Sequence, residues 1–170
     1  SLNDISNIDS KQAIFTSRTD RNAELLIDIW KKKIFPHQNN LKLLVTPGNF
    51  KDIENFNIYL RNLGSRQNMI DNLNESRVFL IPGHKAELYC LAAEEARELC
   101  IPIITLGIGS LSERVIHNKT GFIAKNQEEF ANYTLEVFRN DSLWKELRSN
   151  LLILRGNKTW HKSARTLIES

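Results

Sequence analysis

The sequence predicts an α/β domain with a mostly parallel sheet flanked by helices. Short apolar runs alternate along the chain with longer amphipathic segments, which is the pattern of repeated strand and helix units. The short runs are apolar almost throughout, as expected for strands covered on both faces. The 170 residues, of which 41% are hydrophobic, suffice for one well-cored domain.

The first half of the chain is predicted to alternate three strands with two helices. Residues 12–16 (QAIFT) form an apolar run, and residues 24–33 follow with their apolar side chains on one helical face. Residues 41–46 (LKLLVT) and 57–60 are the next strands. Residues 65–73 have the spacing of a shorter helix, with Ser65 as its N-cap.

The second half continues the alternation with a strand at residues 78–81 and a helix that begins near Leu88 and contains Glu95. Residues 101–106, which contain Pro102, form the next apolar strand, and residues 122–124 are a candidate sixth. Two further helices are predicted at residues 128–139 and 143–154, before a C-terminal stretch with Trp160.

Composition excludes several classes of protein. The net charge of +3 is modest, and Lys31-Lys32-Lys33 is too short to indicate nucleic acid or a membrane. No run approaches the roughly 18 apolar residues of a spanning helix, so we expect a soluble chain without a transmembrane segment. Cys90 and Cys100 lack metal-ligand spacing, and we expect both to be reduced and buried.

The first ten residues are polar and are predicted to be a linker or a frayed terminus. Residues 11–170 then form a single α/β domain. Because Lys11 leads directly into a strand, this opening resembles a cut within a longer protein rather than a natural start.

Ligands of parallel sheets bind at the carboxyl ends of the strands, so the residues after each strand are the candidates for a site. After the first strand come Ser17, Arg18 and Arg21, and two arginines three residues apart can clamp a diphosphate. The alternative is a solvated loop in which Asp20 caps the helix and pairs with an arginine. After the second strand, Gly48 forms either a plain turn or a backbone ledge beside a nucleobase.

The fourth strand is followed by Glu87 and, eight positions later, Glu95. A carboxylate near a helix N-terminus is favourable in any protein, and Glu94, Glu95 and Glu98 also suit a solvated face. After the fifth strand, Gly107-Ile108-Gly109 is a weak glycine signal without the third glycine of a dinucleotide fingerprint. The histidines show no metal-site spacing.

In combination, these segments resemble the C-terminal, donor-binding half of GT-B glycosyltransferases, a Rossmann-like fold. The similarity is greatest to the retaining, family-4-like group (glycosyl transferase group 1). It covers about residues 12–160. The most specific mark is E-x7-E followed by alanine, which stands here as Glu87, LYCLAAE and Glu95-Ala96. A glycine turn with a downstream glutamate is matched by residues 109–113, and G-x-T-G-F by residues 118–122.

This resemblance implies a site for a nucleoside-diphosphate sugar, such as a UDP- or GDP-sugar. Arg18 and Arg21 would hold the diphosphate and Glu87 the transferred sugar, so these three form the implied catalytic set. Glu95 would bind the ribose, and the amides of Tyr89, Cys90 and Leu91 would face phosphate or sugar. Ser17 and Gly48 complete the implied donor-binding set.

The implied reaction is transfer of a sugar to a hydroxyl acceptor with retention, in glycan, polysaccharide or glycolipid biosynthesis. No cofactor or metal is implied, because basic side chains and amides take the place of a cation. A separate N-terminal domain, absent from this chain, would bind a glycan or lipid-linked acceptor, so we expect the fragment alone to be inactive. The implied location is cytoplasmic, either free or peripheral to a membrane.

The chain also departs from the family pattern. Leu88-Tyr89-Cys90 stands where the family often has glycine, an aromatic residue and glycine, and Arg21-Asn22 replaces a lysine–glycine pair. The lost glycines narrow the room near the sugar. The alternative function is therefore a non-catalytic nucleotide- or sugar-binding module of the same fold.

Overall fold

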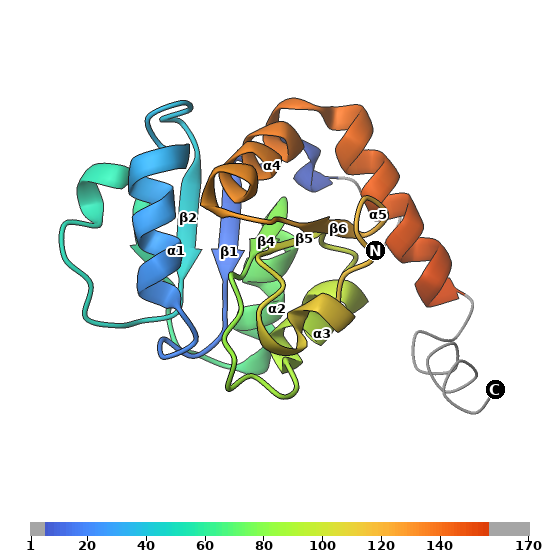
Figure 1. The fold of residues 1–170 in the computed structure, drawn as a ribbon, viewed down its shortest axis with the longest axis horizontal. Coiled ribbons are helices and arrows are strands. Elements are labelled where there is room, and N and C mark those ends of the chain that lie inside the picture. Colours follow the sequence, from blue (N-terminus) through green and yellow to red (C-terminus); the bar gives the residue numbers. More distant parts are fainter. Residues whose placement is uncertain (1–5, 157–170) are drawn as a thin grey trace.

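The computed structural model describes residues 6–156, which fold around a six-stranded sheet (Figure 1). Every neighbouring pair of strands is parallel, and the strand order is β3-β2-β1-β4-β5-β6. This is the Rossmann order, so the predicted fold class is confirmed. The strands are β1 Gln12–Phe15, β2 Lys42–Val45, β3 Ile58–Leu60, β4 Val78–Leu80, β5 Ile103–Thr105 and β6 Gly121–Ile123.

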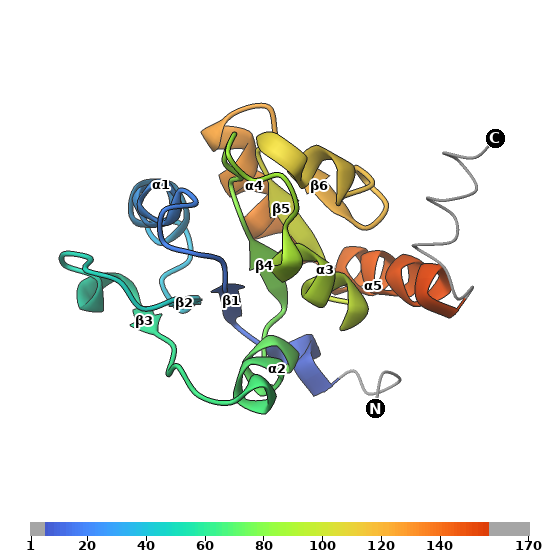
Figure 2. The ribbon, with the colours of Figure 1, turned by 90° about the horizontal axis from the view of Figure 1, so that it is seen from below.

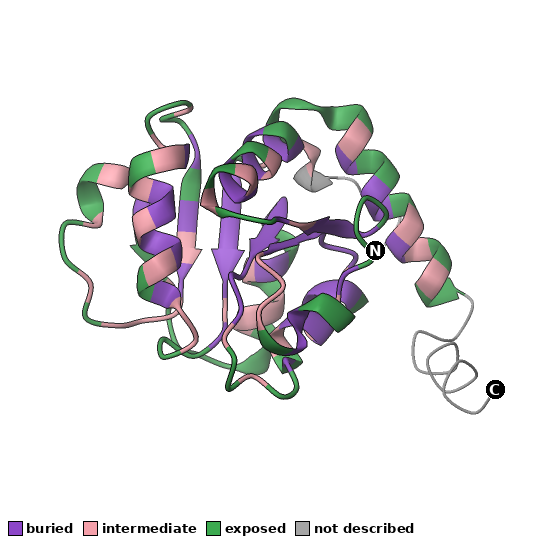
Figure 3. Cartoon of the chain, viewed as in Figure 1, coloured by how far each residue is buried: buried purple, intermediate pink, exposed green. Residues whose placement is uncertain are grey.

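All six predicted strands are present, each within two residues of its expected limits. The central strands β1, β4 and β5 are buried along their whole length, which explains their mostly apolar sequences (Figure 3). The edge strand β3 is as apolar, yet it buries Ile58 and exposes Tyr59 and Leu60. Burial rather than sequence therefore distinguishes the middle of the sheet from this edge.

Helices cover both faces of the sheet (Figure 2). One face carries α1 (Ala23–Ile29), which continues into a π-helical turn at Trp30–Ile34, together with α4 (Gln127–Arg139). The opposite face carries α2 (Arg66–Asn74) and α3 (Leu91–Glu98). The last helix, α5 (Asp141–Gly156), packs against α3 and α4. Short 3-10 turns lie at Ser6–Asp9, Glu54–Phe56 and Gly109–Glu113.

The predicted helices are present, but the start of α3 was predicted too early. The helix begins at Leu91 rather than near Leu88, because Cys90 has an extended backbone and its thiol accepts a hydrogen bond from the Ala93 amide. Glu87 therefore lies in the loop before α3. Ser65 caps α2 as predicted. Trp160 lies outside the described residues.

The chain reverses its direction of sheet growth between β1 and β4. The first three strands extend the sheet away from β1 in one direction, and β4, β5 and β6 extend it in the other. The helices that follow β1 and β4 consequently lie on opposite faces of the sheet (Figure 2). A crevice opens between the carboxyl ends of these two strands, where ligands bind in such sheets.

At the opposite end of β4, Arg77 joins three segments of the chain. Its side chain is 1% exposed, and its guanidinium donates to the carbonyls of Val137 and Ile8 and to the Asp141 carboxylate. The guanidinium also lies 5.0 Å from the centre of the Trp144 ring. Arg77 thus ties the start of β4 to the N-terminal turn and to the junction of α4 and α5.

Replacing Arg77 with methionine should lower the free energy of unfolding by about 2–4 kcal/mol, because buried carbonyls lose their donor. Asp141→Asn is the matched control. Since the Asp141 side chain is 62% exposed, its loss should cost less than about 1 kcal/mol. Urea unfolding followed by circular dichroism measures both, and equal losses in the two variants would contradict the role given to Arg77.

Candidate functional site

A hollow of about 390 Å³ lies at the carboxyl end of the sheet, beside the crevice between β1 and β4. Its walls come from the loop after β1, from α2, and from α3 with the loop before it. Seven of its lining residues are site residues predicted from the sequence: Ser17, Arg18, Arg21, Glu87, Tyr89, Leu91 and Glu95. The remaining three are Thr16, Met69 and Ala92.

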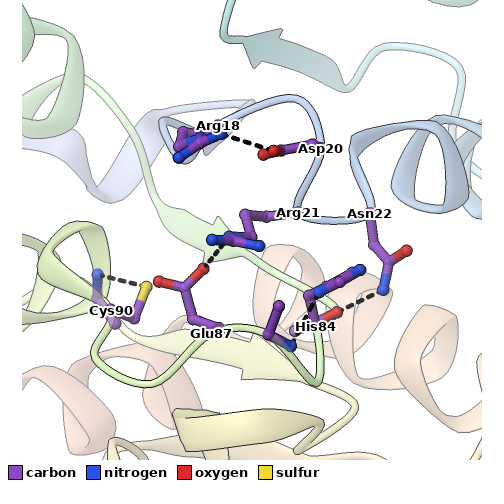
Figure 4. A network of polar contacts seen from close by, with 10 residues as sticks. Arg18, Asp20, Arg21, Asn22, His84, Glu87 and Cys90 are labelled. Atoms are coloured by element: carbon purple, nitrogen blue, oxygen red, sulfur yellow. Dashed lines mark hydrogen bonds and ion pairs between the residues drawn. The ribbon is translucent and has the colours of Figure 1, made fainter.

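The centre of the site is an ion pair between two loops. Arg21 Nε lies 3.0 Å from Glu87 Oε2, with side chains that are 21% and 12% exposed. Figure 4 shows the two side chains pointing toward each other from the loops after β1 and β4. The other carboxylate oxygen of Glu87 has no partner among the described residues and remains available to a ligand.

Asn22 joins the same two loops through a second contact. Its backbone is left-handed, with φ of 66°, and its side-chain amide donates to the Gly83 carbonyl at 2.6 Å (Figure 4). Asn22 is also the N-cap position of α1, although its side chain caps no amide there. The predicted cap at Asp20 is therefore wrong. Asp20 instead pairs with Arg18 at 2.7 Å, which is the local pairing considered as the alternative.

The glycine turn after β5 supports the loop after β4. Gly83 pairs with Ile108, and the Ser110 amide donates to the Glu87 carbonyl at 3.1 Å. A Cβ on Gly83 would lie 2.4 Å from the Ile108 oxygen, and one on Gly109 would lie 2.2 Å from the His84 oxygen. Both glycines also have positive φ. This close backbone approach holds Glu87 in place.

The two remaining charged residues of the hollow are less constrained. The Arg18 side chain is 74% exposed at the rim, where its one ion pair among residues 6–156 is with exposed Asp20. Glu95, on α3, is 27% exposed and lies 3.8 Å from Arg66 of α2. Weak pairing of exposed groups leaves Arg18 free to reorient toward a ligand.

A second hollow, of about 460 Å³, adjoins the first between α2 and α3. The two share Tyr89, Leu91 and Glu95 as lining residues. Its other walls are more apolar and include Ile70, Leu73 and Leu99, with Arg66, Glu94 and Glu98 also in the lining. Sequence patterns gave no signal for this second space, because it depends on how α2 and α3 pack.

The start of α3 presents unpaired backbone amides. The amides of Leu88, Tyr89, Cys90 and Leu91 donate to no other residue in the described part of the chain. Such amides, with the helix dipole behind them, suit an anion. The Cys90 thiol is turned inward, and burial raises its pKa to about 11.

Two of the predicted donor-binding residues lie apart from the hollow. Cys90 is buried and does not line it. Gly48, after β2, lies against Thr19 and the Phe50 ring and is also not part of the lining. Cys100 is buried like Cys90, and both cysteines are free.

Within residues 6–156 no group of three or more His, Cys, Asp or Glu side chains has the arrangement of a metal site. In the same part of the chain, no helix has both the length and the apolar character needed to span a bilayer.

The family model described as glycosyl transferases group 1 matches residues 8–152. The chain belongs to this family. The match covers every strand and all the residues that line the first hollow. A search of curated proteins gave no significant match to this glycosyl transferase domain.

Solved structures of glycosyltransferases share the fold of this glycosyl transferase domain. TarM of S. aureus, in complex with Fondaparinux, alpha-GlcNAc-glycerol and UDP, is 22% identical with a TM-score of 0.73, over 95% of this chain and 34% of TarM. Anabaena HepE in complex with UDP-glucose is 14% identical with a TM-score of 0.69, over 89% of this chain and 48% of HepE.

A third similar structure is the C-terminal domain of a glycosyl transferase group 1 family protein, LpcC, from Francisella tularensis. It is 16% identical with a TM-score of 0.68, over 86% of this chain and 84% of that domain. The chain thus spans about a third to a half of TarM and HepE but most of an isolated C-terminal domain.

Asn22→Ala should destabilise the domain more than Asn22→Gly. Both variants lose the bond to Gly83, but alanine also bears the cost of a left-handed backbone, about 1–2 kcal/mol. The glycine variant is therefore the control that isolates the side-chain contact. Thermal and urea unfolding of the two variants measure the difference, and an alanine variant as stable as the glycine variant would refute this account.

Proposed function

We propose that this domain binds a nucleoside-diphosphate sugar and takes part in transfer of the sugar to a hydroxyl acceptor with retention. The observation that carries the proposal is the Arg21–Glu87 pair, which places a cation and a carboxylate beside the unpaired amides of α3. Membership of the glycosyl transferases group 1 family supports this reading. So do the complexes of TarM with UDP and of HepE with UDP-glucose.

The diphosphate would lie between the loop after β1 and the start of α3. Arg21 is already oriented at the floor of the hollow, and exposed Arg18 is able to turn inward from its surface pair with Asp20. The amides before α3 supply further donors. Together these groups would stabilise the charge that develops on the departing diphosphate, which is the main electrostatic demand of the reaction.

Glu87 would bind hydroxyl groups of the transferred sugar. One of its oxygens is held by Arg21, so the carboxylate has a fixed orientation, and the other oxygen is able to accept from a hydroxyl. Charge-assisted hydrogen bonds of this kind are among the stronger ones in proteins. The arginine that contacts the phosphate would thus also orient the residue that contacts the sugar.

Glu95 would bind the ribose hydroxyls, and the base would then lie beyond it. In a nucleoside diphosphate the ribose stands between the diphosphate and the base. Glu95 lines both hollows, whereas Arg21 and Glu87 line only the first. If the diphosphate lies beside Arg21, the base extends toward the second hollow and its apolar walls. The donor-binding role of Gly48 remains a prediction, since that residue lies outside both linings.

Retention fits a front-face substitution in which the leaving phosphate helps to deprotonate the acceptor. The site needs no metal for this, because arginines and amides supply the positive charge. The acceptor, a glycan or a lipid-linked saccharide, would be bound by a second domain that precedes this one in the full-length protein. The isolated domain should therefore bind nucleotide without turning over.

The second candidate is a non-catalytic binding module of the same fold. It is favoured by Leu88, which is 88% exposed beside Glu87 where the family often has glycine. A side chain at this position would narrow the room for a sugar bound at Glu87. Binding of a nucleoside diphosphate but not of any of its sugars would support this candidate.

Calorimetric titration with UDP, GDP and ADP, then with their sugars, tests donor binding. One nucleotide should bind preferentially, and Glu95→Ala should weaken its binding by about 1–3 kcal/mol because a charged hydrogen-bond partner is lost. Glu136→Ala, an exposed glutamate of α4, is the matched control and should bind as the wild type does. An undiminished affinity of Glu95→Ala would refute the ribose role.

Retention is testable with the full-length protein and its preferred donor. NMR of the product should show the same anomeric configuration as the donor sugar, since the proposed substitution occurs on one face. The 170-residue chain assayed alongside should give no sustained transfer. An inverted product, or steady turnover by the isolated chain, would contradict the mechanism.

A further inference from the structure

Tyr89 forms a wall between the two hollows of the site. Its side chain lines both spaces, although the residue is 48% exposed and the neighbouring Leu88 is 88% exposed. The amides of Leu88, Tyr89 and Cys90 make no hydrogen bonds to described residues, so the backbone amides do not fix the orientation of the ring. A side-chain contact does.

Arg114 supplies that contact. Its guanidinium carbon lies 4.4 Å from the centre of the Tyr89 ring, which is a cation–π distance. Arg114 directly follows the 3-10 turn Gly109–Glu113, which is the turn that supports Glu87 from below. The Arg114 side chain is mostly buried, with 15% exposed, so the ring covers it from solvent.

Glu94 in turn fixes Arg114. Arg114 Nε lies 3.3 Å from Glu94 Oε1, which makes an ion pair without the alignment of a hydrogen bond. The other oxygen of Glu94 accepts from Arg97 Nη2 at 2.6 Å, and Arg97 Nη1 donates to the Arg114 carbonyl at 3.4 Å. Glu94 is only 12% exposed in its side chain, so its predicted place on a solvated face is wrong.

Burying the charges of Glu94, Arg97 and Arg114 costs free energy. Desolvation opposes the ionised forms, and burial lowers the pKa of Arg97 from its ordinary value. Buried ion pairs are often no more stabilising than apolar groups of the same size, but their hydrogen bonds fix geometry. The cluster lies directly behind the loop that would meet the donor, where fixed geometry has a use.

We propose that Arg114 is a positioning residue of the donor site and that Glu94 orients it. This inference rests on the proposed function. Arg114 holds the Tyr89 ring, and the ring keeps Tyr89 and Leu91, whose amides make no hydrogen bonds to described residues, in the lining of the first hollow. Without Arg114 the loop samples other conformations, and the donor must order it on binding.

A double-mutant cycle in the 170-residue chain tests this coupling. The variants are Arg114→Met, Tyr89→Leu and their combination, and the probe is whichever of UDP, GDP and ADP the wild type binds most tightly. Each single variant should weaken binding about fivefold or more, the scale of a partly buried cation–π contact. The combination should be little weaker than either alone, because both remove the same contact.

Three further variants separate positioning from simple loss of charge or stability. Lys119→Met removes an exposed cation shortly after Arg114 and should leave the affinity unchanged. Arg114→Lys keeps the charge and should recover part of the loss, whereas Glu94→Gln should weaken binding while leaving both arginines in place. All titrations are made well below the melting temperature of each variant, which circular dichroism measures.

The possible results separate a failure of the positioning role of Arg114 from a failure of the proposed nucleotide binding. If the wild type binds a nucleotide but Arg114→Met binds it equally well, or the two single losses simply add, the positioning role is overturned. If Arg114→Met does not fold, the cycle is run with Arg114→Lys, and additive losses there overturn the role. If the wild type binds no nucleoside diphosphate, the proposed function fails and the inference fails with it.

Discussion

The parallel pairing of β1 with β4 is the constraint on which the rest of the molecule depends. Ala13 pairs with Val78 and Ile14 with Phe79 at the centre of the sheet, so two strands that lie far apart in sequence end at the same edge. Because the sheet grows away from this pair in both directions, the helices after the two strands cover opposite faces. The loops after β1 and β4 meet at the crevice that remains.

The residues at this crevice are held by contacts between loops rather than by helices or strands. Arg21 forms an ion pair with Glu87, and the Asn22 side chain donates a hydrogen bond to the Gly83 carbonyl. The turn after β5 adds a backbone hydrogen bond to the Glu87 carbonyl. These contacts support one another, because the Glu87 carboxylate reaches Arg21 only when the loop after β4 is held in its place. This mutual support is what a preorganised site requires.

Buried charge appears in two places with different consequences. Arg77, at the start of β4, donates hydrogen bonds to carbonyls of distant segments and so holds the fold together. The cluster of Glu94, Arg97 and Arg114 lies behind the donor loop and contacts it through Tyr89. Neither is recognisable in the sequence, because the residues beside a buried arginine or glutamate along the chain do not differ from those beside an exposed one. For the same reason the sequence predicts Glu94 on a solvated face.

The fold class, the six strands and the family were all predictable from residue patterns along the chain. Apolar periodicity follows directly from burial on one or two faces of a sheet, and the E-x7-E spacing predicts that Glu87 and Glu95 both line one site after the fourth strand, as they do. The pairing of Arg21 with Glu87, the start of α3 at Leu91 and the contact of Arg114 with the Tyr89 ring became visible in the folded chain alone. These features depend on residues from separate segments, and their energies depend on distance and burial. The order of residues along the chain contains neither the distances nor the burial.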